Sequence, residues 1–81
     1  HMVQRRPVLT LDQAIERMEK MLGVKLDWTR LEDFLPPTAD AAYRRSALAS
    51  SFVASLELAR LGRIEIAQDE AYGPLMLRAA R

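Results

Sequence analysis

Three observations predict that this 81-residue sequence forms one small α+β domain. Two stretches with apolar residues at helical spacing stand on either side of a segment that contains a proline pair, which stops a helix. A glycine follows the second stretch, and alternating apolar and polar residues follow the glycine. The expected order is helix, short strand, short helix, turn, long helix and two-stranded hairpin. This is the order of a winged helix, a helix-turn-helix variant with an antiparallel wing.

Composition limits what so small a domain can do. The chain has 49% hydrophobic residues, no cysteine and a net charge of +1. The lack of cysteine excludes disulfides and thiolate metal sites. The only histidine, His1, belongs to a His1-Met2 pair that is typical of an expression-vector scar. We therefore expect residues 1–7 to be scar and disordered lead-in, and residues 8–81 to form one winged-helix domain.

Neither a membrane span nor a secretory leader is expected. No run of about 18 apolar residues occurs, and no basic-then-apolar leader precedes the first helix. The 12 Lys and Arg residues nearly balance the 11 Asp and Glu residues, so net charge gives no reason to expect nucleic acid as a partner. These observations predict a cytoplasmic domain that has no membrane partner.

The first helix is expected over residues 11–22. Thr10 and Gln13 are spaced as a capping box, and Gly23 follows the last apolar position. Six apolar residues recur at helical spacing: Leu11, Ala14, Ile15, Met18, Met21 and Leu22. At this spacing, the methionines favour core packing over a soft-metal or adaptable binding face.

A short strand is expected over residues 24–28, where apolar and polar residues alternate. Thr29 and Glu32 then repeat the capping-box spacing, which predicts a second, short helix. That helix must end by Leu35, because two prolines follow it.

Two aromatic residues flank this short helix. Trp28 and Phe34 are isolated from other aromatics, which favours core positions over a stacking role.

The longest helix is expected from about Asp40 to Leu61, with Gly62 as its stop. The alternating residues 63–68 and the resumed run at 75–78 predict a β-hairpin. Pro74 belongs at the start of the second strand or on an unpaired edge, because proline has no amide donor. The expected core is Ile15, Met18, Leu22, Leu31, Leu35, Leu48, Leu58, Ile64, Ile66 and Leu77.

The long helix carries more apolar surface than one core stripe requires. Its apolar and small residues cover an arc of about 200°, roughly twice the width of such a stripe. One margin, centred on Leu58 and Leu48, is expected to fill the core. The other margin, with Phe52 and Leu56, is either left for a partner or also buried, and periodicity alone leaves both interpretations open.

Winged helices usually read DNA with this helix, but its centre lacks suitable side chains. Residues 46–56 contain no charge and no amide, so only serine hydroxyls could address bases. Acidic residues 69–70 at the wing tip would be repelled by phosphate. A DNA-binding domain of a transcriptional regulator remains the alternative, with phosphate contacts from Arg44, Arg45, Arg60 and Arg63.

A more specific pattern runs through the long helix and the hairpin. It consists of Phe52, Leu56-Glu57-Leu58, Gly62, Ile64, Ile66, Gln68-Asp69-Glu70, Tyr72-Gly73, Leu75 and Leu77. With these residues, the segment 51–78 resembles the C-terminal winged-helix domain of bacterial kleisins, the family of segregation and condensation protein A (ScpA). Before residue 46 only the order of elements agrees. Ala71 stands where the family often has proline, and Pro74 follows the glycine, so the shape of the hairpin turn stays open.

The resemblance implies a C-terminal fragment of a longer kleisin. In that family this domain caps the ATPase head of one SMC subunit, and the N-terminal domain grips the neck of the other subunit. The central segment recruits a dimeric ScpB-type accessory protein. The closed ring serves chromosome condensation and segregation in the cell cycle. The resemblance thus implies an SMC head as direct partner, DNA contact only through the complex, and a nucleoid-associated location.

The resemblance also implies partner-binding residues. Family positions that face the SMC head correspond to Phe52 and Leu56, and the hairpin lies against strands of the head. In such an interface we expect Phe52 and Leu56 to be the anchors, with Arg60 and Met76 at the rim. Tyr72 is expected either as a lid on the wing or as a direct contact.

Two further expectations come from the residues themselves. Gly73 is expected to supply a positive φ in the hairpin turn. The sequence offers no activated nucleophile, glycine-rich phosphate loop or ordered carboxylate pair, so no catalytic residue, cofactor or metal is expected.

Overall fold

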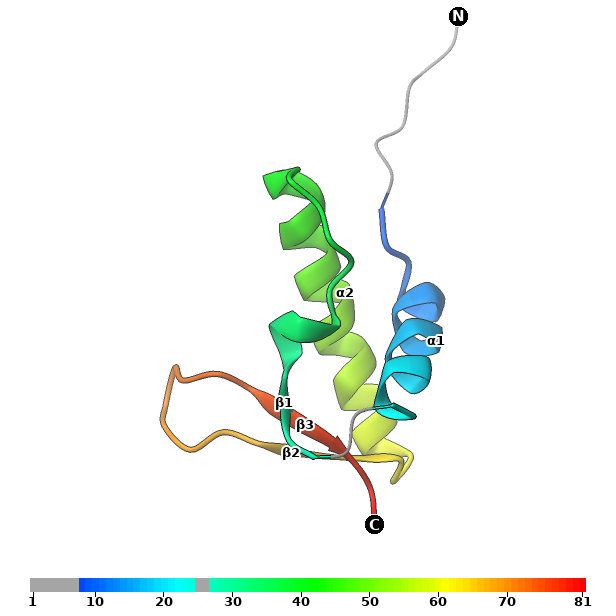
Figure 1. Ribbon diagram of the computed structural model, residues 1–81, viewed down its shortest axis with the longest axis vertical. Helices are drawn as coiled ribbons and strands as arrows, with labels where there is room; N and C mark the ends of the chain where they lie inside the picture. Colours follow the sequence, from blue (N-terminus) through cyan, green and yellow to red (C-terminus); the bar gives the residue numbers. More distant parts are fainter. Residues whose placement is uncertain (1–7, 25–26) are drawn as a thin grey trace, which may run out of the picture.

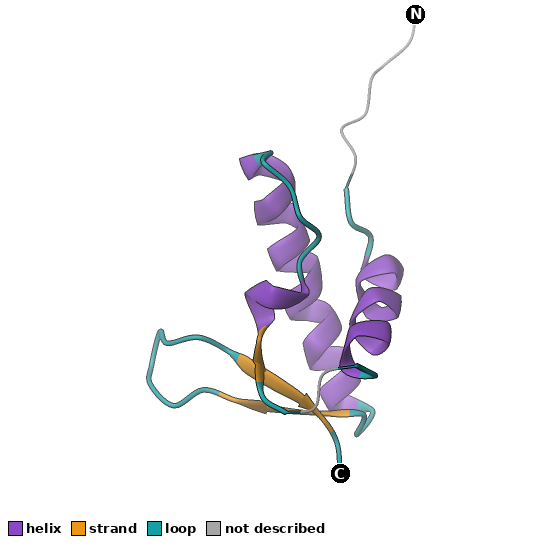
Figure 2. Cartoon of the chain, in the orientation of Figure 1, coloured by secondary structure: helices purple, strands orange, loops and turns teal. Residues whose placement is uncertain are grey.

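The computed structural model describes residues 8–24 and 27–81, so the expected scar and lead-in at 1–7 lie outside the described residues. Figures 1 and 2 show an α+β fold in which two long helices stand on a small sheet. The elements are α1 (Leu11–Leu22), β1 (Thr29–Arg30), the 3-10 helix η1 (Leu31–Phe34), α2 (Ala41–Arg60), β2 (Ile64–Ala67) and β3 (Met76–Ala79).

The sheet is antiparallel, with strand order β1-β3-β2. The expected hairpin is confirmed, since Ile66 of β2 lies opposite Leu77 of β3. On its other side, Leu77 lies opposite Thr29 of β1. The two-stranded wing therefore gains a short third strand, and Pro74 precedes β3, where its missing amide breaks no pairing within the strand.

The first helix and its caps are confirmed. The Thr10 side chain accepts a hydrogen bond from the amide of Gln13, and the Gln13 side chain accepts one from the amide of Thr10. Two otherwise unpaired amide donors are thus satisfied at the helix start. Both methionines pack as expected, because Met18 is fully buried and Met21 packs against the core.

The prediction of a strand over residues 24–28 is wrong at the positions that the structure describes. Val24 lies in a turn, residues 25–26 lie outside the described residues, and the strand occupies Thr29–Arg30. Local hydrogen bonds to Asp27 replace the expected strand pairing. The Asp27 side chain accepts a hydrogen bond from the Trp28 amide, and the Asp27 carbonyl accepts one from the Thr29 hydroxyl.

The prediction of a second capping box at Thr29 and Glu32 is also wrong. Thr29 is a strand residue, and the short helix η1 begins after Arg30 without a side-chain cap. The expected end of this helix is confirmed, since η1 stops at Phe34. Arg17 of α1 holds that end, because its Nε donates to the Phe34 carbonyl at 2.8 Å and its Nη2 donates to the Leu35 carbonyl at 3.3 Å.

The long helix α2 has the expected caps. Asp40 accepts hydrogen bonds from the amides of Ala42 (2.9 Å) and Tyr43 (3.2 Å). At the other end, Gly62 adopts a φ of +75°, which an L side chain rarely takes. The glycine turns the chain from α2 into β2.

We expect Gly62→Ala to lower the free energy of unfolding by about 1 kcal/mol. No atom lies within 4 Å of the position that a Cβ would occupy, so backbone strain is the only new term. Thermal unfolding followed by circular dichroism should show the melting temperature falling by about 4–8 °C. The melting temperature of Gly62→Asn should fall less than that of Gly62→Ala, because asparagine tolerates a positive φ better than alanine does. An unchanged melting temperature in the alanine variant would contradict the strained turn.

The core lies between α1, α2, η1 and the inner face of the sheet. Its buried apolar residues are Leu9, Ala14, Met18, Leu22, Leu31, Phe34, Leu35, Ala47, Ala54, Leu58, Ile64 and Leu77. Phe34 is therefore core, as expected. Ile15 and Ile66 pack against the core while partly buried.

Two residues expected in the core are found at the surface. Leu48 is 39% exposed, because α1 and the sheet cover the other side of α2, where smaller side chains lie. Trp28 is 37% exposed, and its ring lies 4.4 Å from the Arg78 guanidinium carbon.

Candidate functional site

The side of α2 away from the core is apolar and exposed. Leu48, Phe52, Val53 and Leu56 keep 39%, 44%, 48% and 49% of their surface exposed, respectively. Leu48, Phe52 and Leu56 are spaced four residues apart, so their side chains form one ridge. We call these four residues the exposed α2 face. The expected surplus of apolar surface on this helix is confirmed at Phe52 and Leu56.

Small side chains on the opposite side of α2 explain why this face stays free. Ala47, Ser51, Ala54 and Ser55 are buried there together with Leu58. Their small size lets α1 pack close beside α2 (Figure 1). The expected core did not include the two buried serines, Ser51 and Ser55. Ser55 can be buried because its hydroxyl donates a hydrogen bond to the Phe52 carbonyl at 2.6 Å.

A groove of about 500 Å³ lies beside the exposed α2 face. It is bounded by η1, by α2 and by the two ends of the hairpin loop, with lining residues Leu31, Arg45, Leu48, Ala49, Phe52, Gln68 and Leu75. Most of these side chains are apolar. Within the described residues, Arg45 is the one cation among them and makes no ion pair there. The helix face and the hairpin thus form two walls of one concave apolar surface.

Arg60 lies at the C-terminal end of α2 and pairs with Glu57. Its Nε donates to a Glu57 carboxylate oxygen at 3.0 Å, and its Nη2 donates to the other oxygen. Because the hydrogen bonds from Arg60 favour the charged carboxylate, they hold the pKa of Glu57 below its ordinary value. The same contacts raise the pKa of Arg60.

We expect Arg60→Ala to return the pKa of Glu57 toward its ordinary value in a carboxyl-detected NMR titration. Since the folded-state pKa of Glu57 is depressed, the stabilisation from this pair is present above the unfolded-state pKa and is lost as pH falls through the folded-state pKa. The effect on stability should be small, because solvent screens both side chains. A Glu57 titration that the substitution leaves unmoved would contradict the pairing.

The structure brings Phe52, Leu56 and Arg60 together along α2 but separates Met76 from them. Met76 precedes the buried Leu77, so it lies on the other face of the sheet. There it lines a separate hollow with Asp69, Glu70 and Pro74. The fifth expected residue, Tyr72, lies in the hairpin loop.

Two expectations about that loop are wrong. The positive φ belongs to Tyr72, at +65°, and not to Gly73. Gly73 is needed for a close approach instead, because a Cβ on it would lie 3.0 Å from the Glu70 carbonyl oxygen. Tyr72 is not a lid, since its side chain is completely exposed.

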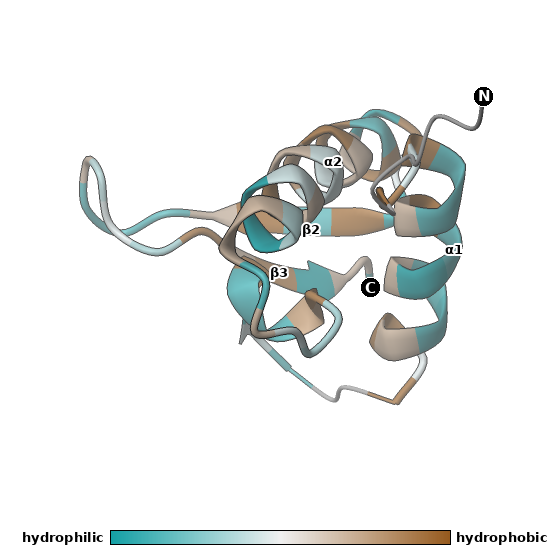
Figure 3. Cartoon of the chain, turned by 90° about the horizontal axis from the view of Figure 1, so that it is seen from above, coloured by the Kyte–Doolittle hydropathy of each residue, from teal (hydrophilic) through white to brown (hydrophobic). Residues whose placement is uncertain are grey.

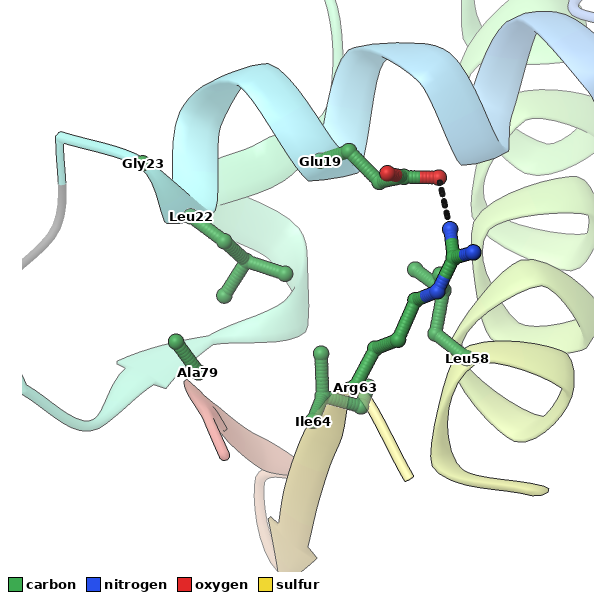
Figure 4. Close-up of a pocket in the computed structure, with 7 residues that line it drawn as sticks. All are labelled: Glu19, Leu22, Gly23, Leu58, Arg63, Ile64 and Ala79. Atoms are coloured by element: carbon green, nitrogen blue, oxygen red, sulfur yellow. Dashed lines mark hydrogen bonds and ion pairs between the residues drawn. The ribbon is translucent and has the colours of Figure 1, made fainter. Parts of the chain in front are cut away.

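Another hollow, of about 240 Å³, lies between the C-terminal ends of α1 and α2 and the sheet (Figure 4). Its lining residues are Glu19, Leu22, Gly23, Leu58, Arg63, Ile64 and Ala79. Arg63 and Glu19 form an ion pair across it at 3.1 Å, which links α1 to the turn after α2. Both side chains are about half exposed, so this pair adds little stability.

The four arginines considered for phosphate contacts are not equivalent. Arg60 pairs with Glu57 and Arg63 pairs with Glu19, so two of the four charges are already neutralised. Arg44 and Arg45 make no ion pair within residues 8–24 and 27–81. The exposed helix surface between these two pairs of cations is apolar, which suits a protein surface better than a phosphate backbone.

Two other kinds of feature, a metal site and a membrane span, are absent among the described residues. In this part of the chain, no group of three or more His, Cys, Asp or Glu residues is arranged to hold a metal ion. No described helix combines the length and the hydropathy needed to span a bilayer.

The two packed helices, the antiparallel sheet and the projecting hairpin define a winged-helix domain. No protein-family model matches the sequence, and no curated protein matches it. Among solved structures, the chain is similar to one in the crystal structure of the SmcHead bound to the C-winged helix domain of ScpA. The TM-score is 0.59 at 20% identity, and the similarity covers 85% of this chain and 91% of that chain. The comparison confirms the winged-helix fold.

Proposed function

We propose that this chain is the C-terminal winged-helix domain of an ScpA-type kleisin and that it binds the ATPase head of an SMC protein through the exposed α2 face. One observation carries the proposal. A ridge of large apolar side chains, Leu48, Phe52 and Leu56, lies open to solvent on the side of α2 away from the core. In soluble domains, such a patch marks an interaction surface.

The fold comparison supports the choice of partner. The similar winged helix is, by its description, bound to an SMC head. The pattern of residues 51–78 resembles the same kleisin family, and it includes Phe52 and Leu56. The sequence pattern and the exposed surface thus favour the same two side chains.

The chemistry of the surface fits a protein interface. Aromatic and aliphatic side chains at the centre would enter pockets on the head and supply most of the affinity. Arg60 and Glu57, already paired at the end of the ridge, would stay at the solvated rim, where charges contribute little. We propose no catalytic role for the domain, and ATP hydrolysis would belong to the SMC partner.

The wider role follows from the same proposal. The domain would close one side of an SMC-kleisin ring that acts in chromosome condensation and segregation. A ScpB-type accessory protein would bind elsewhere on the longer kleisin, and contact with DNA would be indirect. The complex would be cytoplasmic and nucleoid-associated.

Calorimetric titration of the domain into a purified SMC head fragment tests the proposal. We expect saturable one-to-one binding with a negative heat-capacity change, because apolar surface is buried. The affinity should change by less than about threefold between 50 and 200 mM salt, because contacts between apolar groups are not screened. Lack of binding at 100 µM of each protein would overturn the proposal.

A parallel titration with duplex DNA tests the alternative, a DNA-binding domain of a transcriptional regulator. Four phosphate contacts, from Arg44, Arg45, Arg60 and Arg63, would weaken DNA binding about 150-fold over the same salt range, since each contact adds about 0.9 to the log-log slope. DNA binding with that salt dependence, together with no binding to the head, would favour the regulator.

A further inference from the structure

Tyr72 adopts a conformation that is unusual for its residue type. Its φ is +65°, in the left-handed region that disfavours bulky L residues. The next residue is Gly73, which could adopt such a φ at no steric cost, yet the strain falls on the tyrosine. The positive φ therefore lies on the residue type that tolerates it less.

Hydrogen bonds within the loop hold Tyr72 in this conformation. The Gly73 amide donates to the Glu70 carbonyl at 2.9 Å, and the Gln68 side-chain amide donates to the Gly73 carbonyl at 2.8 Å. These bonds tie the residues on both sides of Tyr72 to each other. The backbone at Tyr72, and with it the direction in which the side chain leaves the loop, is thus set before any partner binds.

The tyrosine ring adds no packing to the described structure. The Tyr72 side chain is completely exposed, so it packs against nothing in the described structure. Strained residues persist where the surrounding structure enforces them, and they cluster at binding and switch sites. An exposed aromatic ring on a backbone that is already held in place is also the kind of side chain that anchors protein interfaces.

The loop that carries Tyr72 continues the surface proposed for the SMC head. Gln68 and Leu75, at the two ends of this loop, line the groove together with Phe52 and Leu48. In two perpendicular views the loop extends clear of the helices (Figures 1 and 3). A partner seated in the groove would therefore also reach the loop.

We infer that Tyr72 is a second anchor of this interface, held in its binding orientation by the strained loop. The inference rests on the proposed function. The ring would enter an apolar pocket on the SMC head, with a hydrogen-bond acceptor for the hydroxyl.

Three substitutions separate the ring from the strain. Tyr72→Ala and Tyr72→Gly both remove the ring, and each should weaken head binding about tenfold or more. Tyr72→Phe keeps the ring and should stay within about threefold of the parent domain. Because alanine keeps the backbone strain and glycine relieves it, the glycine variant should melt about 4 °C or more above the alanine variant.

Chemical nitration gives a second readout that does not depend on a substitution. The chain has two tyrosines, and Tyr43 packs against the core. Tetranitromethane should nitrate Tyr72 in the free domain, and the head should protect it in the complex. Nitration of Tyr43, which is partly buried, should be slower than that of Tyr72 in the free domain and should not change on binding, which provides an internal control.

The outcomes separate the anchor from the proposed function. If Tyr72→Ala binds within twofold of the parent domain while Phe52→Arg does not bind, Tyr72 is not an anchor and the proposed function stands. Equal nitration of Tyr72 in free and bound states would also reject the anchor. Failure of the parent domain to bind the head would overturn both.

Discussion

Phe52→Arg is expected to abolish binding to the SMC head while the domain stays folded. Phe52 is 44% exposed at the centre of the ridge and also lines the groove, so a partner on this surface must cover it. Arginine there would bring an unpaired charge into a dehydrated interface and remove the aromatic anchor. We expect a loss of at least 100-fold in affinity, equivalent to about 2.7 kcal/mol, measured by calorimetry. Leu56→Arg should behave in the same way.

Leu61→Arg provides a matched control. Leu61 is 50% exposed, similar to Leu56, and lies at the C-cap of the same helix. It is nine residues after Phe52, which places it on the opposite side of the helix axis, about 180° away. This variant should bind the head within about threefold of the parent domain. If it loses binding as severely as Phe52→Arg, added positive charge rather than the ridge explains the loss.

Circular dichroism of each variant distinguishes an interface residue from a core residue. The arginine variants should keep the helical spectrum and a melting temperature close to that of the parent. An unfolded Phe52→Arg or Leu56→Arg variant would show that these side chains support the fold, and the assignment of the exposed α2 face would fail.

The sequence predicted that α2 carries surplus apolar surface, but it misplaced the boundary of the core. Helical periodicity assigns Leu48 to the core with Leu58, whereas the buried side consists mainly of alanine and serine. The sequence does contain a sign of the buried side, because small residues and one leucine recur there at helical spacing: Ala47, Ser51, Ala54 and Leu58. Its meaning depends on how closely α1 approaches, and that distance follows from packing in three dimensions rather than from periodicity along one helix.

The wing illustrates a different limit of sequence reasoning. Its two strands follow directly from alternation, and the structure confirms them. The loop conformation does not follow from residue preferences, because those preferences assign the positive φ to Gly73. The hydrogen bond of Gln68 to Gly73 and the close approach of Gly73 to Glu70 place it on Tyr72 instead. Such contacts between nearby residues override the intrinsic preference of one residue.

The first strand shows how pairing selects residues that alternation does not. Residues 24–28 alternate, yet the strand forms at Thr29 and Arg30, which lie opposite Leu77 and Met76 of β3. A hydrogen bond from the Leu31 amide to the Leu75 carbonyl extends this pairing. The register is therefore decided by the partner strand, which a pattern within one segment does not contain.

Phe34→Ala is expected to have the largest effect on stability. The Phe34 side chain is fully buried, and its carbonyl is held by Arg17 of α1. Removing a buried ring costs about 3–5 kcal/mol, because the transfer free energy is lost and a cavity remains. A domain of this size has a total stability of about 4–12 kcal/mol. Urea unfolding should therefore show a greatly lowered midpoint or a largely unfolded protein.

The same substitution at the only other phenylalanine separates folding from binding. Phe52→Ala removes an identical ring from a site that is 44% exposed, so it should cost about 1 kcal/mol or less in stability. It should nevertheless weaken binding to the SMC head about tenfold or more, because the ring is an anchor in the complex. If Phe52→Ala destabilises the domain as much as Phe34→Ala, both rings belong to one core. The exposed α2 face would then not be available to a partner.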